Sequence, residues 1–377
     1  MPPKFAPQYL VVFLCLFLIL FSCTERYHPA IDGNFSALVV DGKITNEDGP
    51  YEIKLFQTLS LDSVKITDSI VPEINASIQI FNDSGESDFF SEIYPGVYRN
   101  QSLDFKGEVG QSYWIKIRTA DGVEYESVPE LMKPPMEIIN MYGQESVHVI
   151  SNDSEIDAVK FYFDAKDETN QTSYLRWEAL ESWEWHSPFY LAFTNNPSRV
   201  CFPTDVIDNI NVYDASQLKE KEILKLPITF STKEEQKLNY EYYIRIFVRS
   251  ISKQNYLFWN HIKKISQSSG SLFDAIPGNI EGNVFSCDGG RSVVGYFEVS
   301  SISVKGTSFS ESMYGVEFDD FPPECVELHS VNNPPDPAIY YVLRIVQMGP
   351  DIHYYFRRKK CYDCNVEYSP TKPSFWK

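Results

Sequence analysis

The chain has 377 residues, enough for two domains of ordinary size, each with its own core. Its formal net charge of −19 repels phosphate backbones, and no basic stripe offsets that charge, which argues against nucleic acid as a partner. The same charge argues against electrostatic attachment to an anionic membrane. Aromatic residues make up 15% of the chain, and its alternation of polar and apolar residues favours antiparallel β structure over helical bundles.

The first element in the chain is an unbroken apolar run over residues 10–21, with Lys4 as the only charge before it. A helix of this length spans about 18 Å, well short of the roughly 30 Å hydrocarbon core of a bilayer. The run therefore predicts a signal peptide over residues 1–22. It ends in Leu20-Phe21-Ser22-Cys23, which is similar to a bacterial lipobox. We expect a lipidated Cys23 and a polar tether over residues 23–36; the alternative is a buried cysteine in a signal anchor.

Residues 37–132 contain a series of short apolar-polar alternations separated by turn residues. Tyr51, Ile53 and Leu55, for example, alternate with Glu52 and Lys54. About seven such strands fall within roughly 95 residues, each bounded by Gly, Pro, Asn or Asp, which is the spacing of a β-sandwich. We predict an immunoglobulin-like or prealbumin-like sandwich. Its strands are expected at residues 38–44, 51–55, 78–81, 89–90, 97–98, 113–117 and 123–125.

Two prolines then interrupt the pattern, in Lys133-Pro134-Pro135. Proline cannot donate to a strand ladder and restrains the preceding residue to extended conformations, so residues 133–136 are predicted to be a stiff linker. Residues 137–377 are predicted to form a larger β-rich domain with one prominent helix and a cysteine-containing tail. Strands are expected at residues 161–163, 175–180, 242–249, 293–297, 302–304 and 340–346, with the final stretch otherwise irregular.

The predicted helix covers residues 253–268, with Ser252 as its N-cap and Gly270 at its end. Trp259, Ile262 and Ile265 lie near helical spacing, and we expect them to pack the helix on a sheet.

Five cysteines follow Cys23, and an odd number leaves at least one thiol free or paired between chains. Cys361-x-x-Cys364 could form a redox pair or half a zinc site. However, no second ligand pair has the matching spacing, and no βαβ context surrounds it. We therefore predict no metal site and favour structural disulfides that hold the tail, with the connectivity left open. The candidate disulfide residues are Cys201, Cys287, Cys325, Cys361 and Cys364.

Aromatic residues gather at Trp183, Trp185 and Tyr190, beside His186. Because aromatic faces stack on sugar rings and other flat ligands, these residues are the candidate contacts for a ligand such as a glycan or siderophore. The favoured interpretation is that Trp177 belongs to the core and that the others cover a sheet edge or a partner surface.

No catalytic motif stands out. The six histidines are scattered, and none lies near a Gly-x-Ser-x-Gly elbow or in a His-Glu-x-x-His helix. Phosphate loops and dinucleotide fingerprints are also absent from the sequence. We therefore predict no catalytic residue and no cofactor; an enzyme such as a glycoside hydrolase is the least favoured class.

Four stretches together resemble a family of Bacteroidota lipoproteins known as domain of unknown function forty-two forty-nine. These stretches are residues 38–46 with 49–51, residues 94–98, residues 270–283 running into 294–297, and the tail from Cys361-Tyr362-Asp363-Cys364 to Lys372-Pro373-Ser374-Phe375-Trp376.

The resemblance implies an outer-membrane lipoprotein of the kind often paired with TonB-dependent transporters. The expected function is thus a non-enzymatic accessory or ligand-capture subunit of such a nutrient uptake system, anchored through Cys23 at the cell surface. The alternative is a stand-alone surface binding or assembly lipoprotein, similar to an adhesin. Surface-exposed lipoproteins of this phylum often carry an acidic cluster after the lipidated cysteine. Here Thr24-Glu25-Arg26 supplies one acid and one base, so the sequence departs from that pattern, and outer-membrane location is predicted more firmly than surface exposure.

Overall fold

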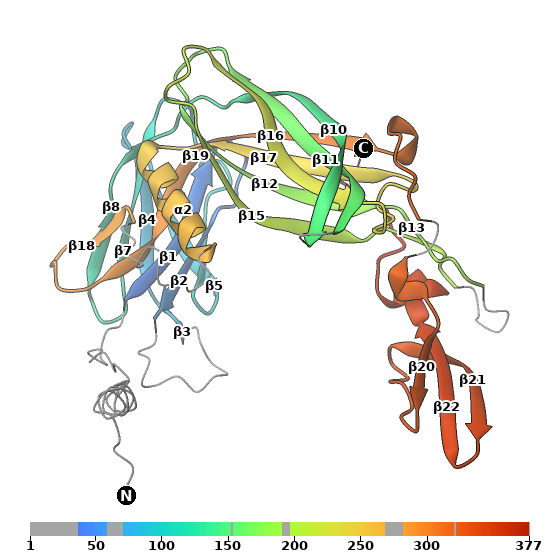
Figure 1. The fold of residues 1–377 in the computed structure, drawn as a ribbon. Coiled ribbons are helices and arrows are strands. Elements are labelled where there is room, and N and C mark those ends of the chain that lie inside the picture. The colour runs from blue at the N-terminus through green and yellow to red at the C-terminus, as the bar shows by residue number, and fades with distance from the viewer. Residues whose placement is uncertain are drawn as a thin grey trace, which may run out of the picture.

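The structure is a computed structural model that describes residues 37–58, 71–151, 154–190, 197–267, 282–319 and 322–376 (Figure 1). It is mainly β, which confirms the predicted fold class. The predicted signal peptide, Cys23, its tether and most of the 270–283 motif lie outside the described residues. One continuous sheet runs through the body, in the order β15-β12-β17-β19-β1-β2-β6-β5-β4-β7-β8-β18.

The N-terminal part of this sheet forms a sandwich-like unit, and all seven strands predicted there are present. Their apolar positions alternate inward: Ile53 and Leu55 are completely buried, as is Tyr98. Two short additions pair with the sheet, β3 (Val71–Pro72) with β2 and β9 (Glu130–Leu131) with β7. The main strands are β1 (Leu38–Thr45), β2 (Glu52–Gln57), β4 (Ser77–Asn82), β5 (Ser87–Tyr94), β6 (Val97–Asn100), β7 (Ser112–Arg118) and β8 (Glu124–Ser127).

Residues from much later in the chain complete this unit. Strand β18 (Val284–Ser286) pairs with β8, and the first half of β19 (Val293–Phe309) runs parallel to β1. Phe297 and Val299 of β19 are buried in the same core as Ile53. Gly295 has a φ of +106°, and a Cβ there would collide with the carbonyl of Val40, so only glycine permits this close pairing.

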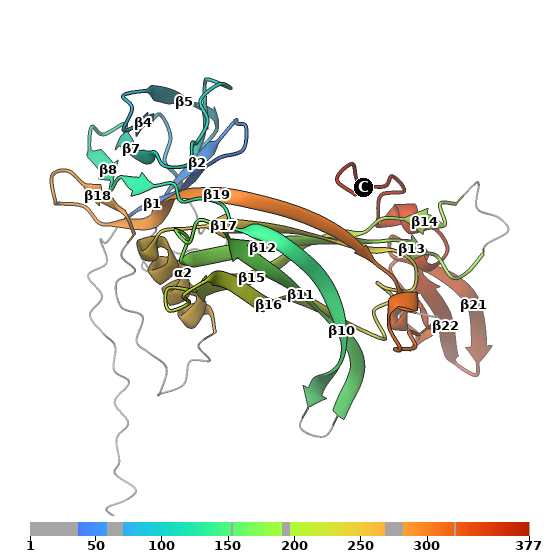
Figure 2. The ribbon, with the colours of Figure 1, turned by 90° about the horizontal axis from the view of Figure 1, so that it is seen from above.

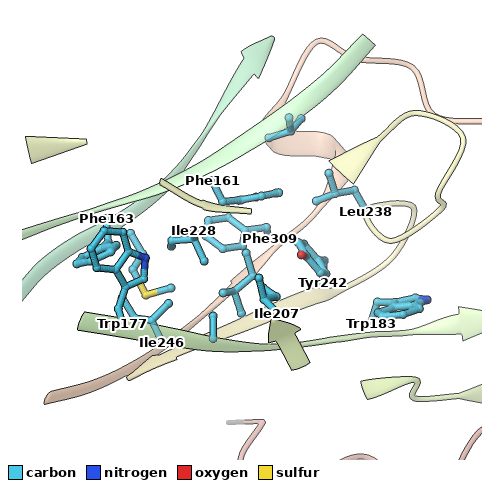
Figure 3. Packing of buried hydrophobic residues seen from close by; sticks show 14 of the residues in the cluster. Phe161, Phe163, Trp177, Trp183, Ile207, Ile228, Leu238, Tyr242, Ile246 and Phe309 are labelled. Atoms are coloured by element: carbon cyan, nitrogen blue, oxygen red, sulfur yellow. The ribbon is translucent and has the colours of Figure 1, made fainter. Parts of the chain in front are cut away.

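The second half of β19 belongs to another unit, where two sheets pack face to face (Figure 2). Aromatic and aliphatic side chains fill the space between them, among them Phe161, Phe163 and Trp177 (Figure 3). One sheet contains β15 (Thr204–Asp214), β12 (Tyr174–Trp183), β17 (Tyr242–Ser250) and β19. The other contains β10 (Glu137–Ser151), β11 (Ser154–Asp167) and β16 (Lys221–Thr232).

Three strands of this second unit, β10, β15 and β16, were not predicted, and β19 is one strand of 17 residues instead of two. Buried polar residues explain the apparent break in β19, because Ser300 and Ser301 are completely buried where an apolar alternation would be expected.

The predicted helix is present as α2 (Lys253–Ser266), and it lies against β12, β15 and β19. Ser252 caps it by accepting a 3.0 Å hydrogen bond from the amide of Asn255, as predicted, but the helix ends at Gln267, before Gly270. Its buried face was predicted wrongly: Asn255 and Phe258 are buried, whereas Trp259 is only half-buried. No helix among the described residues is both long and apolar enough to cross a membrane.

A group of buried charges lies on the sheet face beneath α2. Glu298 of β19 is 5% exposed, and its carboxylate lies 3.2 Å from the guanidinium of Arg176 and 3.6 Å from that of Arg249. Ser300 donates a further hydrogen bond of 2.8 Å. Although burial alone would raise the pKa of Glu298, the two arginines lower it to about 2. The indole of Trp259 covers the group, 4.0 Å from the guanidinium carbon of Arg176.

Replacing Glu298 with Gln should lower the free energy of unfolding by about 3 kcal/mol, the lower end of the range for breaking a buried ion pair. Arg176 and Arg249 would then keep only the partly exposed Glu178 as a shared counter-charge. The folded-state pKa is depressed from 4.5, so this contribution is complete above that pH and disappears as the pH falls towards 2. Urea unfolding at pH 7 and pH 3 measures both effects. Glu52→Gln is the matched control, since its pair with Arg99 is exposed and should contribute less than about 1 kcal/mol. Equal losses from both variants would contradict a special role for Glu298.

Candidate functional site

The C-terminal part of the chain forms a separate sheet that projects from one end of the body (Figures 1 and 2). Its three antiparallel strands are β20 (Leu328–Val331), β21 (Tyr340–Met348) and β22 (Asp351–Arg358), in the order β20-β22-β21. We call residues 328–358 the finger. Only a strand at residues 340–346 was predicted in this stretch, and the expectation of an otherwise irregular tail was wrong.

Two disulfides hold the base of the finger. Cys325–Cys361 joins the residues on either side of it, and Cys201–Cys364 fastens the following segment to β14 (Val200–Cys201) of the body. These bonds confirm structural cysteines that pin the tail; Cys361 and Cys364 bond to partners elsewhere and not to each other. Cys287 is the one unpaired, exposed cysteine among the described residues.

Hydrogen bonds add to this attachment. The amide of Phe189 donates to the carbonyl of Cys361 over 3.0 Å, and the amide of Cys364 donates to Ser198 over 2.9 Å. Lys360 is 4% exposed and forms an ion pair of 2.9 Å with Glu367. The base of the finger is therefore fixed on the body by covalent, ionic and backbone contacts together.

The finger is covered only at its base, where Tyr341 and Leu343 pack partly buried against the core of the body. No residue from 326 to 359 is buried, and large apolar side chains are exposed along it. Ile345 is 61% exposed and Met348 is 52% exposed. The visible support comes from ring contacts, such as the guanidinium of Arg344 lying 3.8 Å from the ring centre of Tyr355. Several large exposed apolar side chains on one small element are a feature of interaction surfaces in soluble proteins.

The predicted aromatic contact residues have different environments. Trp183 and Trp185 are 7% and 3% exposed and belong to the core, so their faces are not available to a ligand, and that part of the prediction is corrected. His186 stacks on Tyr240 with ring centres 3.6 Å apart and lies 2.5 Å from the carboxylate of Glu184. Tyr190 remains exposed. The structure therefore does not bring these four residues together as an open aromatic platform.

A cavity that the sequence did not predict lies between the N-terminal end of α2, the β8–β9 segment and β19. Its volume is about 610 Å³, which is within the usual range for small-molecule sites. Val128, Leu131 and Leu257 contribute exposed apolar walls, at 50%, 40% and 52% exposure. Glu130, Ser252 and Tyr296 contribute polar groups, and His261 also lines the cavity.

Glu130 is the buried acid of this cavity, at 6% exposure. Its Oε1 accepts hydrogen bonds from the hydroxyls of Ser252, at 2.9 Å, and of Tyr296. Its Oε2 is buried without a hydrogen-bond partner. Burial raises the pKa of this carboxyl to about 7, more than the two hydroxyl hydrogen bonds lower it. No sequence motif marks this group, because its members come from three distant segments.

No group of three or more His, Cys, Asp or Glu side chains in the described part of the chain could hold a metal ion.

The family described as Domain of unknown function (DUF4249) matches residues 24–305. The chain belongs to this family. The match confirms the resemblance and includes the residues that form the cavity, whereas the finger lies beyond it. Within this DUF4249 chain, the family-like residues 294–297 contain Gly295, the glycine on which the pairing of β1 and β19 depends.

No curated protein matches the chain. One solved structure with some similarity is the crystal structure of a tetra-tandem repeat in the extending region of a large adhesion protein. It shares 9% identity, with 57% of this chain and 45% of that chain covered, at a TM-score of 0.16. The chain thus spans less than half of that protein, and the similarity supports no argument about fold or function.

Peptide mapping without reduction should recover Cys201 linked to Cys364 and Cys325 linked to Cys361. Cys287 should react with an alkylating reagent in the folded protein, because it is exposed and unpaired. Mass spectrometry of the non-reduced, alkylated protein measures both. A peptide that contains Cys361 bonded to Cys364, or alkylation at either of them, would contradict the described attachment of the finger.

Proposed function

We propose that this protein is a non-enzymatic accessory lipoprotein of the outer membrane, anchored through Cys23, that docks on a TonB-dependent transporter. The observation that supports the proposal is the finger, a fixed and projecting sheet with exposed apolar side chains. The expectation of an outer-membrane lipoprotein comes from the lipobox-like sequence and the family resemblance.

The finger is costly to maintain as a separate sheet. Three strands need a covered apolar face for independent stability, yet no residue from 326 to 359 is buried. Disulfides at its base supply the missing support by restricting the unfolded chain. Ile345 and Met348 are exposed on this disulfide-supported sheet. Apolar side chains of this kind are typical of the part of a surface that a partner covers in a complex.

Fixing the base also favours binding. A surface already held in one conformation loses less conformational entropy when a partner covers it. A lipid anchor would hold the protein in the same membrane as the transporter, which raises its effective concentration there. Modest contacts through the finger would then be sufficient for a stable assembly.

The anchor has its own test. Replacing Cys23 with Ala should release the protein from the membrane fraction, because no acyl chains are then attached. Cell fractionation with a carbonate wash, followed by immunoblotting, measures the release, and Cys287→Ala is the control that should stay bound. A Cys23→Ala protein that remains in the washed membranes would contradict the lipid anchor.

The partner is tested by purifying the tagged native lipoprotein in mild detergent and identifying what accompanies it. We expect a TonB-dependent barrel in near-equal amount, at least tenfold depleted by Ile345→Asp, which places a charge in the exposed finger surface. Val206→Asp on β15 is the matched control, since both side chains are 61% exposed. Recovery of the barrel with both variants would contradict docking through the finger. Recovery of the native protein alone would favour a stand-alone surface binding protein instead.

A further inference from the structure

Three buried glutamates show what is unusual about the cavity beside α2. Glu130, Glu181 and Glu298 are 6%, 7% and 5% exposed. Glu298 is paired with Arg176, and the carboxylate of Glu181 lies 2.8 Å from the ammonium group of Lys237. Glu130 has no cationic partner among the described residues: its contacts are two hydroxyls, and its Oε2 has no hydrogen-bond partner. A buried carboxylate without a counter-charge is costly unless something supplies one.

We infer that this cavity binds a ligand that carries a protonated primary amine on an apolar body. The amine supplies the counter-charge that Glu130 lacks, and the apolar body lies against Leu131, Leu257 and Phe258. This is a second function of the molecule, separate in place from the finger.

The walls of the cavity favour this ligand over the other common classes. An anionic ligand would bring a second negative charge next to Glu130, within a chain whose net charge is −19. A sugar stacks on an open aromatic face, but the two aromatic rings that line the cavity, Phe258 and Tyr296, are only 8% and 5% exposed. The open walls, Val128, Leu131 and Leu257, are aliphatic. These three side chains are 40–52% exposed around the cavity, and an apolar body that covers them removes this apolar surface from water.

The charge state of Glu130 links binding to pH. Its pKa of about 7 means that the empty site holds a proton at pH 6 and has mostly lost it at pH 8. A primary amine stays protonated over this range. The other titratable groups around Glu130 are Tyr113, which pairs with it across β7 and β9, His261 of α2, and Tyr296 and Glu298 of β19. Of these, His261 also lines the cavity, so it needs its own control.

The test is isothermal titration of the full lipoprotein in mild detergent with three probes of equal length: hexylamine, hexanol and hexanoate. Titrations into detergent alone are subtracted. Hexylamine should bind about tenfold more tightly at pH 8 than at pH 6, with proton release at pH 6 that is visible as a dependence on buffer ionisation. Hexanol should bind at least tenfold more weakly than hexylamine at pH 8, and hexanoate should not bind.

Variants assign the effect to Glu130. Glu130→Gln keeps the shape and the hydroxyl contacts, and it should weaken hexylamine at pH 8 at least tenfold and remove the pH dependence while leaving hexanol unchanged. Glu124→Gln, an exposed position on β8, should behave as the native protein, and His261→Asn should retain the pH dependence. Leu257→Ser should weaken hexylamine and hexanol alike.

The inference is overturned if hexanol or hexanoate binds as tightly as hexylamine, if Glu130→Gln leaves affinity and pH dependence intact, or if no probe binds. Should Glu130→Gln prove unstable, the pH dependence and proton release of the native protein decide the question. None of these results bears on docking through the finger, which the purification experiment tests separately.

Discussion

The carboxylate of Glu298, enclosed by Arg176 and Arg249, occupies the point on which the two halves of the body depend. It lies on β19, whose first half pairs with β1 and whose second half pairs with β17. The arginines come from β12 and β17, so the ion pairs connect three neighbouring strands on one face of the sheet. Removing Glu298 would leave Arg176 and Arg249 with only the partly exposed Glu178 as a shared counter-charge. Strand β19 and the charge cluster around Glu298 therefore connect the two halves of the body.

The body and the finger are stabilised by different physical means. In the body, two apolar cores supply the free energy, one inside the N-terminal unit and one between the facing sheets. The finger has no buried residue between 326 and 359, and besides the packing of Tyr341 and Leu343 on the body it relies on the two disulfides at its base. This division allows an apolar surface to remain exposed without weakening the cores. The cavity at Glu130 lies in the body and not in the finger.

Local patterns predicted the fold best where one strand face is buried and the other exposed. Ile53 and Leu55 alternate with polar residues, and the strand they predict is present as β2. Prediction failed where burial does not alternate. The middle of β19 is buried through Ser300 and Ser301, and β22 has no buried residue at all, so neither shows an apolar period. Ser252 correctly marked the start of α2, yet the buried face depends on which side chains the sheet accommodates, which sequence spacing alone does not determine.

The site was less predictable than the fold. The cysteine count predicted structural disulfides and at least one thiol that is free or paired between chains. The connectivity depends on distant segments that meet only in three dimensions. Glu130 is one of 52 acidic residues, and nothing near it in the sequence distinguishes it from the others. Glu130 has no cationic partner because of the distant segments that surround it in the fold, and the sequence next to it does not show which segments these are. The aromatic cluster was predicted as a ligand contact because several aromatic residues lie close together in the sequence. In the structure, Trp183 and Trp185 belong to the hydrophobic core.

The parallel pairing of β1 with β19 also constrains the order in which the chain can assemble. When the first strands emerge from a ribosome or a secretion channel, the partner of β1 is still some 250 residues away, as the register of Leu38 with Val293 shows. Until then the sandwich lacks Phe297 and Val299 and presents β1 and β8 as open edges, which are templates for wrong pairing. A fragment cut at residues 133–136 would keep both open edges permanently, because it lacks β18 and β19.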